Sequence, residues 1–185
     1  MGLFAEEVNT MTRFLTIICC LLLCLSLTSG CQKQSEAPPT QPAEQKAAAL
    51  PDADGRTLTE FITATQDYRQ WPMFPGKDAL YKGQHPHGAY LTTYVSPPVL
   101  AALQSKSGKL PDGAIIVKEN YSPEKELAAV TVMYRRTGYN PEAGDWFWIK
   151  YSPDQTILAE GKVDGCINCH RAVQDNDWVF TGPVK

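Results

Sequence analysis

Two cysteines and a histidine near the C-terminal end of the sequence have the types and spacing to do chemistry. Cys166, Cys169 and His170 form a Cys-x-x-Cys-His pattern, which is the attachment signature of a c-type haem. Two thiols at this spacing can add to the two vinyl groups of one porphyrin, and the adjacent imidazole can then bind the iron. The pattern therefore predicts one haem c, covalently held by Cys166 and Cys169, with His170 as an iron ligand.

A Cys-x-x-Cys pair can also belong to two other kinds of site. A zinc site needs two further ligands, and the sequence holds no second Cys-x-x-Cys pair. A redox-active dithiol is expected in a thioredoxin-like βαβ context, whereas this motif lies close to the C-terminus. The haem interpretation is therefore favoured over both alternatives.

The composition limits the class of protein. The 185 residues predict one domain of ordinary size, and the net charge of −3 gives no reason to expect a nucleic-acid partner. Of the six cysteines, four lie in or beside an N-terminal apolar segment, and only Cys166 and Cys169 belong to the body of the chain. A structural disulfide framework is therefore not expected.

The N-terminal segment has the features of a bacterial secretory signal. Arg13 supplies a basic region before the apolar stretch 14–27, which is short for a membrane-spanning helix. The sequence that follows, Leu-Thr-Ser-Gly-Cys at 27–31, resembles a lipobox, with Thr28 where the pattern prefers leucine. We therefore expect a signal peptide at 1–30 and a lipid on Cys31, which would make the protein a membrane-anchored periplasmic lipoprotein. Cleavage nearby without lipidation and an uncleaved anchor are the alternatives.

The rest of the chain divides into a tether and one folded domain. Residues 31–55 are rich in proline, alanine, glutamine and glutamate without apolar periodicity, which is typical of a flexible linker. Residues 56–185 carry helical patterns at 57–69 and 96–104. Their strand patterns are short and closely spaced, at 90–95, 114–120, 127–135, 146–151 and 157–162. Such spacing predicts a mainly β (α+β) fold, with an antiparallel sheet and a few flanking helices around one c-type haem.

The order of four sequence features resembles the cytochrome P460 family. They are the strand pattern Gly113 to Glu119, the Gly-Asp-Trp turn at 144–146, the haem motif, and the Asp-Trp-Val-Phe-Thr segment at 177–181. The resemblance covers most of the region from Tyr68 to Thr181. It implies a mostly β haem domain, commonly a homodimer, whose iron is bound by the motif histidine on one side and open on the other. Family members oxidise hydroxylamine or bind and process nitric oxide, and the related β-type cytochromes c-prime bind diatomic gases.

The resemblance implies a further role for Lys118. In the P460 family, a lysine at this strand position bonds covalently to a meso carbon of the haem, and Lys118 falls on that position. Strand alternation places Lys118 on the same face as Ile116, so an inward-facing Ile116 would bring Lys118 inward too. Burial of a lysine is rare without a partner or a purpose. The alternative is a lysine at a strand edge with its amine in water.

The residues expected over the open side of the haem differ from those of the hydroxylamine-oxidising members. Those enzymes carry a glutamate and an arginine there, and an ungapped count places Val130 and Leu91 at these positions. Neither side chain can accept a proton, so the resemblance implies an apolar distal pocket that favours gas binding over proton-coupled oxidation. His87 is a third distal candidate, as an iron ligand or hydrogen-bond donor, whereas His85 is expected at the surface.

Three functions remain as alternatives. The first is a haem oxidoreductase that acts on hydroxylamine or nitric oxide, with Lys118 as a catalytic residue. The second is a gas-binding cytochrome without catalysis, and the third is a low-spin electron carrier with two axial ligands. The expected partners are a small nitrogen-containing or diatomic ligand, a periplasmic electron-transfer protein, the membrane through a lipid anchor, and a second copy in a homodimer. No nucleic-acid partner is expected.

Overall fold

The computed structural model describes residues 49–185. The signal peptide predicted at 1–30 and most of the tether predicted at 31–55 lie outside these residues. The described residues belong to one compact unit, and none of their helices is long and apolar enough to cross a membrane. The first helix, α1 (Gly55–Glu60), begins where the side chain of Asp54 accepts a hydrogen bond from the backbone nitrogen of Thr57 at 2.9 Å.

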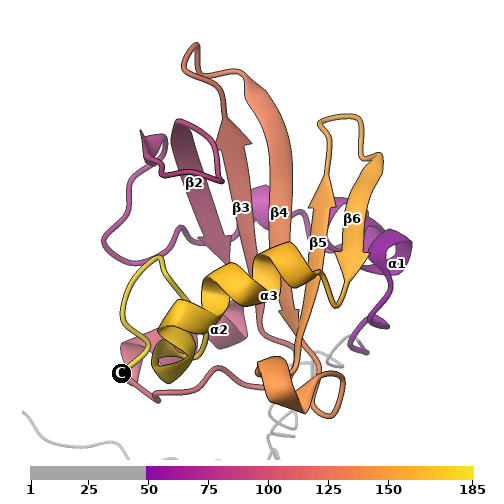
Figure 1. Cartoon of the computed structure of the whole chain (residues 1–185), viewed down its shortest axis with the longest axis vertical. Helices are drawn as coiled ribbons and strands as arrows, with labels where there is room; N and C mark the ends of the chain where they lie inside the picture. Colours follow the sequence, from indigo (N-terminus) through magenta and orange to yellow (C-terminus); the bar gives the residue numbers. More distant parts are fainter. Residues whose placement is uncertain (1–48) are drawn as a thin grey trace, which may run out of the picture. The chain divides into compact units, whose positions relative to one another are not determined.

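A six-stranded antiparallel sheet forms the centre of this unit (Figure 1). Its strands are β1 (Tyr81–Lys82), β2 (Tyr90–Val95), β3 (Ile115–Tyr121), β4 (Leu127–Arg135), β5 (Trp146–Tyr151) and β6 (Ile157–Gly161). The strands lie side by side in the same order as they occur in the chain. The predicted antiparallel meander is thus confirmed, and the two-residue strand β1 is an addition that the sequence patterns did not predict.

The two faces of the sheet are covered by different helices. The remaining helices are the π-helix η1 (Phe61–Thr65), the α-helices α2 (Pro97–Gln104) and α3 (Asp164–His170), and the 3₁₀ helices η2 (Tyr68–Gln70), η3 (Pro141–Ala143) and η4 (Arg171–Asn176). Figure 1 shows α3 crossing one face of the sheet in front of the central strands. Leu58 of α1 and Ile62 of η1 pack on the opposite face.

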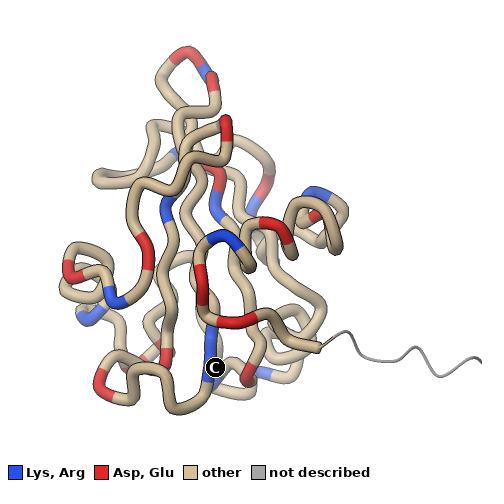
Figure 2. The backbone as a smooth tube through the Cα atoms, turned by 90° about the vertical axis from the view of Figure 1, so that its right-hand side faces the viewer, with Lys and Arg blue, Asp and Glu red and all other residues tan. Residues whose placement is uncertain are grey.

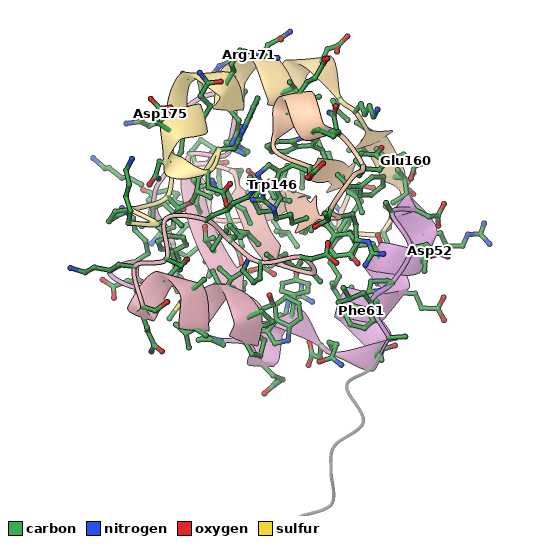
Figure 3. The ribbon with its side chains drawn as sticks, turned by 90° about the horizontal axis from the view of Figure 1, so that it is seen from below. Asp52, Phe61, Trp146, Glu160, Arg171 and Asp175 are labelled. Atoms are coloured by element: carbon green, nitrogen blue, oxygen red, sulfur yellow. The ribbon has the colours of Figure 1, made fainter. Side chains whose placement is uncertain are left out.

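Each central strand buries side chains on both faces, which gives the domain two apolar layers. Ile116, Met133 and Trp148 are directly opposite one another on β3, β4 and β5, so they share a face. They pack in one cluster with Ile167 of α3 and with residues after it. Trp146 belongs to the same layer and lies in the interior, as seen from below, while Arg171 and Asp175 lie at the periphery (Figure 3).

Charged residues occur along the whole described part of the chain, including its central strands (Figure 2). Three of those in the described part of the chain are buried, namely Glu119, Arg135 and Asp177. A buried charge is costly unless it is paired and hydrogen-bonded. Each of the three has such partners, which are described below.

Candidate haem site

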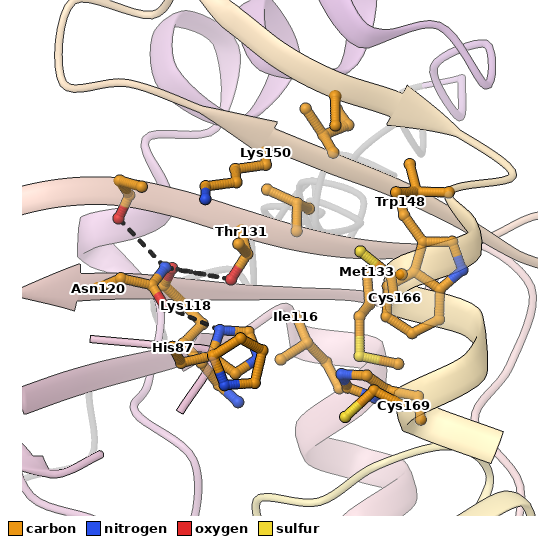
Figure 4. A pocket seen from close by; sticks show the side chains of 18 of the residues that line it. His87, Ile116, Lys118, Asn120, Thr131, Met133, Trp148, Lys150, Cys166 and Cys169 are labelled. Carbon is orange, nitrogen blue, oxygen red and sulfur yellow. Dashed lines mark hydrogen bonds between the residues drawn. The ribbon is translucent and has the colours of Figure 1, made fainter. Parts of the chain in front are cut away.

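A cavity of about 540 Å³ lies between one face of the sheet and helix α3 (Figure 4). Apolar side chains form much of its wall, including Ile116, Met133 and Trp148 of the sheet and Phe180 after α3. Outside the Cys-x-x-Cys-His motif, its polar side chains are His87, Lys118, Asn120, Thr131, Lys150 and Thr181. An apolar cavity with a small number of polar groups is typical of a cofactor site.

Helix α3 carries the whole Cys-x-x-Cys-His motif to the edge of this cavity. Cys166 and Cys169 are three residues apart, so they lie on one face of the helix, and both line the cavity. Both thiols are free, Cys166 half-buried and Cys169 exposed. Burial raises the pKa of the Cys166 thiol. The described residues contain no cluster of three histidine, cysteine or acidic side chains arranged for a metal ion.

His170 is held with one ring nitrogen available to the cavity. The ring is buried, and its centroid lies 4.6 Å from that of Trp148 and 5.2 Å from that of Phe180. Nδ1 lies 2.7 Å from the carbonyl oxygen of Trp178. A carbonyl oxygen can only accept, so Nδ1 carries the hydrogen and Nε2 keeps its lone pair. Burial also lowers the pKa of His170, which favours the neutral ring that a metal ligand requires.

Lys118 lies in the interior of the sheet and faces the cavity. Strand β3 has neighbours on both sides, and Lys118 is directly opposite Thr93 and Thr131. The side chain lines the cavity instead of lying at a strand edge. Burial lowers the pKa of its amine to about 8, and the positive charge of Lys77 adds to this effect.

His87 reaches the same cavity from the loop between β1 and β2. Its Nδ1 lies 2.9 Å from Oδ1 of Asn120, and its ring centroid is 6.3 Å from that of His170. Burial is the main cause that lowers the pKa of His87 to about 4, with the charge of Lys118 as the next contribution. His85 is exposed and does not line the cavity.

A comparison with known protein families matches residues 65–181 to Cytochrome P460. This range is more than half of the chain and includes the strands of the cavity and helix α3. The chain belongs to the cytochrome P460 family. Proteins of this family bind haem c and its iron, which identifies the chain as a haem protein. A search of curated proteins found no match.

The residues that line the cavity fit a haem c. The cavity has apolar walls on both sides, two free thiols on one helix face, and an imidazole whose unprotonated Nε2 is left without a protein partner. Cys166 and Cys169 would hold the porphyrin, and His170 would bind the iron. The cofactor predicted from the motif and the geometry of the cavity therefore agree.

A buried ion pair positions the carbonyl group that holds His170. Nη1 of Arg135 lies 2.6 and 2.7 Å from the two carboxylate oxygens of Asp177, which also accepts a hydrogen bond from the backbone nitrogen of Leu110 at 2.7 Å. Asp177 and Trp178 have φ angles of 52° and 67°, in the left-handed region that side chains other than glycine disfavour. The ion pair stabilises this turn, and the turn presents the Trp178 carbonyl to His170. The motif gave no indication of this support.

The structure does not place Val130 and Leu91 at the haem cavity, contrary to the prediction. Val130 is directly opposite Glu119 and packs with Leu58 on the other face of the sheet, while its neighbours Ala129 and Thr131 line the cavity. Side chains alternate along a strand, so an ungapped count that is wrong by one residue selects the wrong face. Leu91 pairs with Asn120 but does not line the cavity.

The cavity therefore contains polar groups where the sequence predicted an apolar pocket. In place of two apolar side chains, the cavity presents His87, Asn120, Thr131 and the amine of Lys118. Of these, His87 and Lys118 were predicted from the sequence as site residues, whereas Asn120 and Thr131 were not. Asn120 is recognisable as a polar residue on the same strand face as Lys118, since the two are two positions apart.

Replacing Val130 with glutamate is expected to lower the free energy of unfolding by about 3–5 kcal/mol, because it buries a carboxylate without a partner. The new charge would face Glu119, which already accepts hydrogen bonds from Tyr68 at 2.7 Å, Tyr121 at 2.6 Å and Arg69 at 3.0 Å. Urea unfolding of the holoprotein measures the effect, and Val130→Thr, which adds no charge, is the matched control. A stable Val130→Glu protein with an altered haem spectrum would contradict the assignment of Val130 to the far face.

Proposed function

We propose that this member of the cytochrome P460 family is an exported haem c protein that binds or oxidises small nitrogen species, such as nitric oxide or hydroxylamine, on the side of the haem opposite His170. The observation that carries the proposal is the gathering of His87, Lys118 and Asn120 in the same apolar cavity as the haem motif. A bound haem supplies an iron that can take a small ligand and exchange electrons.

The protein's own residues have distinct parts in this proposal. Cys166 and Cys169 hold the cofactor, and His170 binds the iron through Nε2. The apolar walls around Ile116 and Trp148 exclude water, which favours small ligands of little charge. These parts are common to ligand binding and to catalysis.

Two cavity groups can move protons, which supports oxidation as well as binding. With a pKa lowered to about 4, His87 is neutral at pH 7 and can accept a proton. As long as its amine is not bonded to the haem, Lys118, with a pKa of about 8, is mostly protonated at pH 7 and can donate a hydrogen bond or a proton. A positioned acid or base typically contributes about 10²–10⁴-fold in rate. Whenever its Nε2 is free, His87 can thus take the part that a glutamate has in the hydroxylamine-oxidising members of the family.

The test is an optical and kinetic study of protein matured with haem. We expect haem to remain on the denatured protein in a gel, because thioether bonds survive denaturation. We also expect the ferrous protein to change its spectrum with nitric oxide, and hydroxylamine to reduce an added electron acceptor. Denatured protein without haem would refute the haem c assignment. A holoprotein that keeps its spectrum with nitric oxide and leaves hydroxylamine unreacted would favour the electron carrier.

The cellular location is also a proposal. A lipid on Cys31 would anchor the domain to a membrane in the periplasm, where we propose that it meets an electron-transfer protein and forms a homodimer. Cell fractionation tests the anchor, since Cys31→Ala should move the protein from the membrane fraction to the soluble periplasmic fraction. Wild-type protein that is already soluble in the periplasm would refute it.

A further inference from the structure

We propose that His87 is the second axial ligand of the haem iron, held in the ligating tautomer by Asn120, so that an external ligand has to displace it. The inference rests on the proposed function in one respect, namely that a haem c occupies the cavity. It adds a property of the site, because an iron with two protein ligands binds small molecules only when one of the ligands leaves.

Asn120 determines which nitrogen of His87 carries the hydrogen. The Asn120 amide nitrogen donates to the carbonyl oxygens of Lys118 and Ala129 at 2.9 and 3.2 Å, and lies 3.2 Å from Oγ1 of Thr131. Turning the amide over would set its oxygen against two carbonyl oxygens, so Oδ1 must be the atom that faces His87. An amide oxygen only accepts, and Nδ1 of His87 at 2.9 Å is therefore the donor. Nε2 of His87 is left with a free lone pair.

The two histidines of the cavity therefore have the same tautomer. Each donates its Nδ1 hydrogen to a protein oxygen, His170 to the Trp178 carbonyl and His87 to the Asn120 amide. Each keeps an unprotonated Nε2, which is the form that binds a metal. A hydrogen bond to the other ring nitrogen is also the arrangement that fixes the orientation of metal-bound histidines.

The distance between the two rings suits a shared metal ion. Their centroids are 6.3 Å apart, and their planes are at 89°. With metal–nitrogen bonds of about 2.0–2.1 Å and about 1.1 Å from each nitrogen to its ring centroid, two imidazoles on opposite sides of one metal have centroids about 6.3 Å apart. The two rings therefore have the separation that ligation to one iron requires.

The loop that carries His87 lies close to the sheet. Its backbone is closed by hydrogen bonds from Gly83 to Ala89 at 2.9 Å and from His87 to Gln84 at 3.0 Å. A Cβ atom on Gly88 would lie 2.5 Å from the backbone nitrogen and oxygen of Tyr121. Only glycine allows this approach, and the approach brings the neighbouring His87 over the cavity.

Lys118 is another cavity group that could bind the iron. Its amine can ligate only when it has lost its proton, and with a pKa of about 8 it is mostly protonated at pH 7. His87 has no such requirement, because its Nε2 is already free. The imidazole is therefore the favoured ligand.

The spin state of the ferric holoprotein tests the inference directly. We expect the wild type to be six-coordinate and low-spin by electron paramagnetic resonance. His87→Gly should become high-spin and should bind carbon monoxide in its ferrous form at least about tenfold faster, since a ligand binds only the fraction of molecules whose iron is free. Added imidazole should restore the low-spin signal in His87→Gly.

Matched variants separate ligation from general damage to the loop. His85→Gly changes an exposed histidine two positions away and should keep the wild-type signal. Asn120→Ala should give a mixture of spin states, and Asn120→Asp, which still accepts from Nδ1, should be closer to the wild type. A high-spin wild type that retains its haem in a denaturing gel would overturn the role of His87 and leave the proposed haem protein intact. Loss of haem in the gel would instead overturn the proposed function.

Discussion

Replacing Asp177 with alanine is expected to lower the free energy of unfolding by about 3–5 kcal/mol, one of the largest losses for a single side chain in this domain. The change leaves the guanidinium of Arg135, whose side chain is 4 % exposed, without its carboxylate partner. It also leaves the backbone nitrogen of Leu110 without its acceptor. Urea unfolding of the holoprotein measures the loss, and an unchanged dependence on urea concentration would show that the unfolded states are comparable.

The exposed ion pair between Arg136 and Asp112 provides the control. Its charged atoms are 3.8 Å apart and both side chains are partly exposed, so Asp112→Ala should cost about 1 kcal/mol or less. The double variant Arg135→Met with Asp177→Asn removes both charges and retains an acceptor for Leu110, so it should recover much of the loss. Equal effects of Asp177→Ala and Asp112→Ala would contradict the importance of the buried pair.

We expect Lys118 to be covalently bonded to the haem in the mature protein, which would change both the mass and the absorption spectrum of the holoprotein. The amine nitrogen would replace a hydrogen on a bridging carbon of the porphyrin and lose one of its own. An oxidant such as a peroxide would take the two electrons, and two protons would leave. Intact mass should therefore be two hydrogen atoms lower than that of an ordinary haem c adduct, and the reduced absorption band should be strongly shifted to the red.

Lys118→Ala should restore both the ordinary mass and an ordinary c-type spectrum. Lys150 is the matched control, because it also lines the cavity but is exposed, and Lys150→Ala should keep the bond to Lys118. A wild-type protein with the unmodified mass and an ordinary spectrum would show that Lys118 is only a polar group of the cavity.

Formation of this bond should depend on pH in a defined direction. The reactive form is the neutral amine, and a pKa lowered from 10.5 to about 8 leaves roughly one amine in ten neutral at pH 7 and about nine in ten at pH 9. Protein matured under reducing conditions and then treated with peroxide should therefore form the bond several times faster at pH 9 than at pH 7. A rate that falls over this range would exclude the neutral amine as the reactive form.

Strand positions could be predicted well because alternation and turn residues are local signals. The patterns at 90–95, 127–135 and 146–151 coincide with β2, β4 and β5, and β3 is shifted by one residue. Strand β1 was missed because two paired residues leave no periodic pattern in a segment rich in proline and glycine. Local signals thus sufficed for the sheet but not for its short first strand.

The site was less predictable because its supports come from distant parts of the chain. The same-face relation of Lys118 and Ile116 follows from alternation, and the structure agrees with it. Alternation cannot say which face meets the haem, however, because β4 buries apolar residues on both faces, and Val130 was assigned to the wrong one. Likewise, a carbonyl group such as that of Trp178 carries no side-chain signature in the sequence.

The order of the strands has a consequence for how the protein acquires its haem. Every strand pairs with the next one in the chain, so all pairings of the sheet involve residues before 162, and helix α3 follows them. Pairings between sequence neighbours close short loops and form early in folding. We therefore expect the strands to pair before helix α3, which carries Cys166 and Cys169, packs against the sheet. Covalent attachment by Cys166 and Cys169 would then follow formation of the sheet, and the porphyrin would link helix α3 to strands that are already paired.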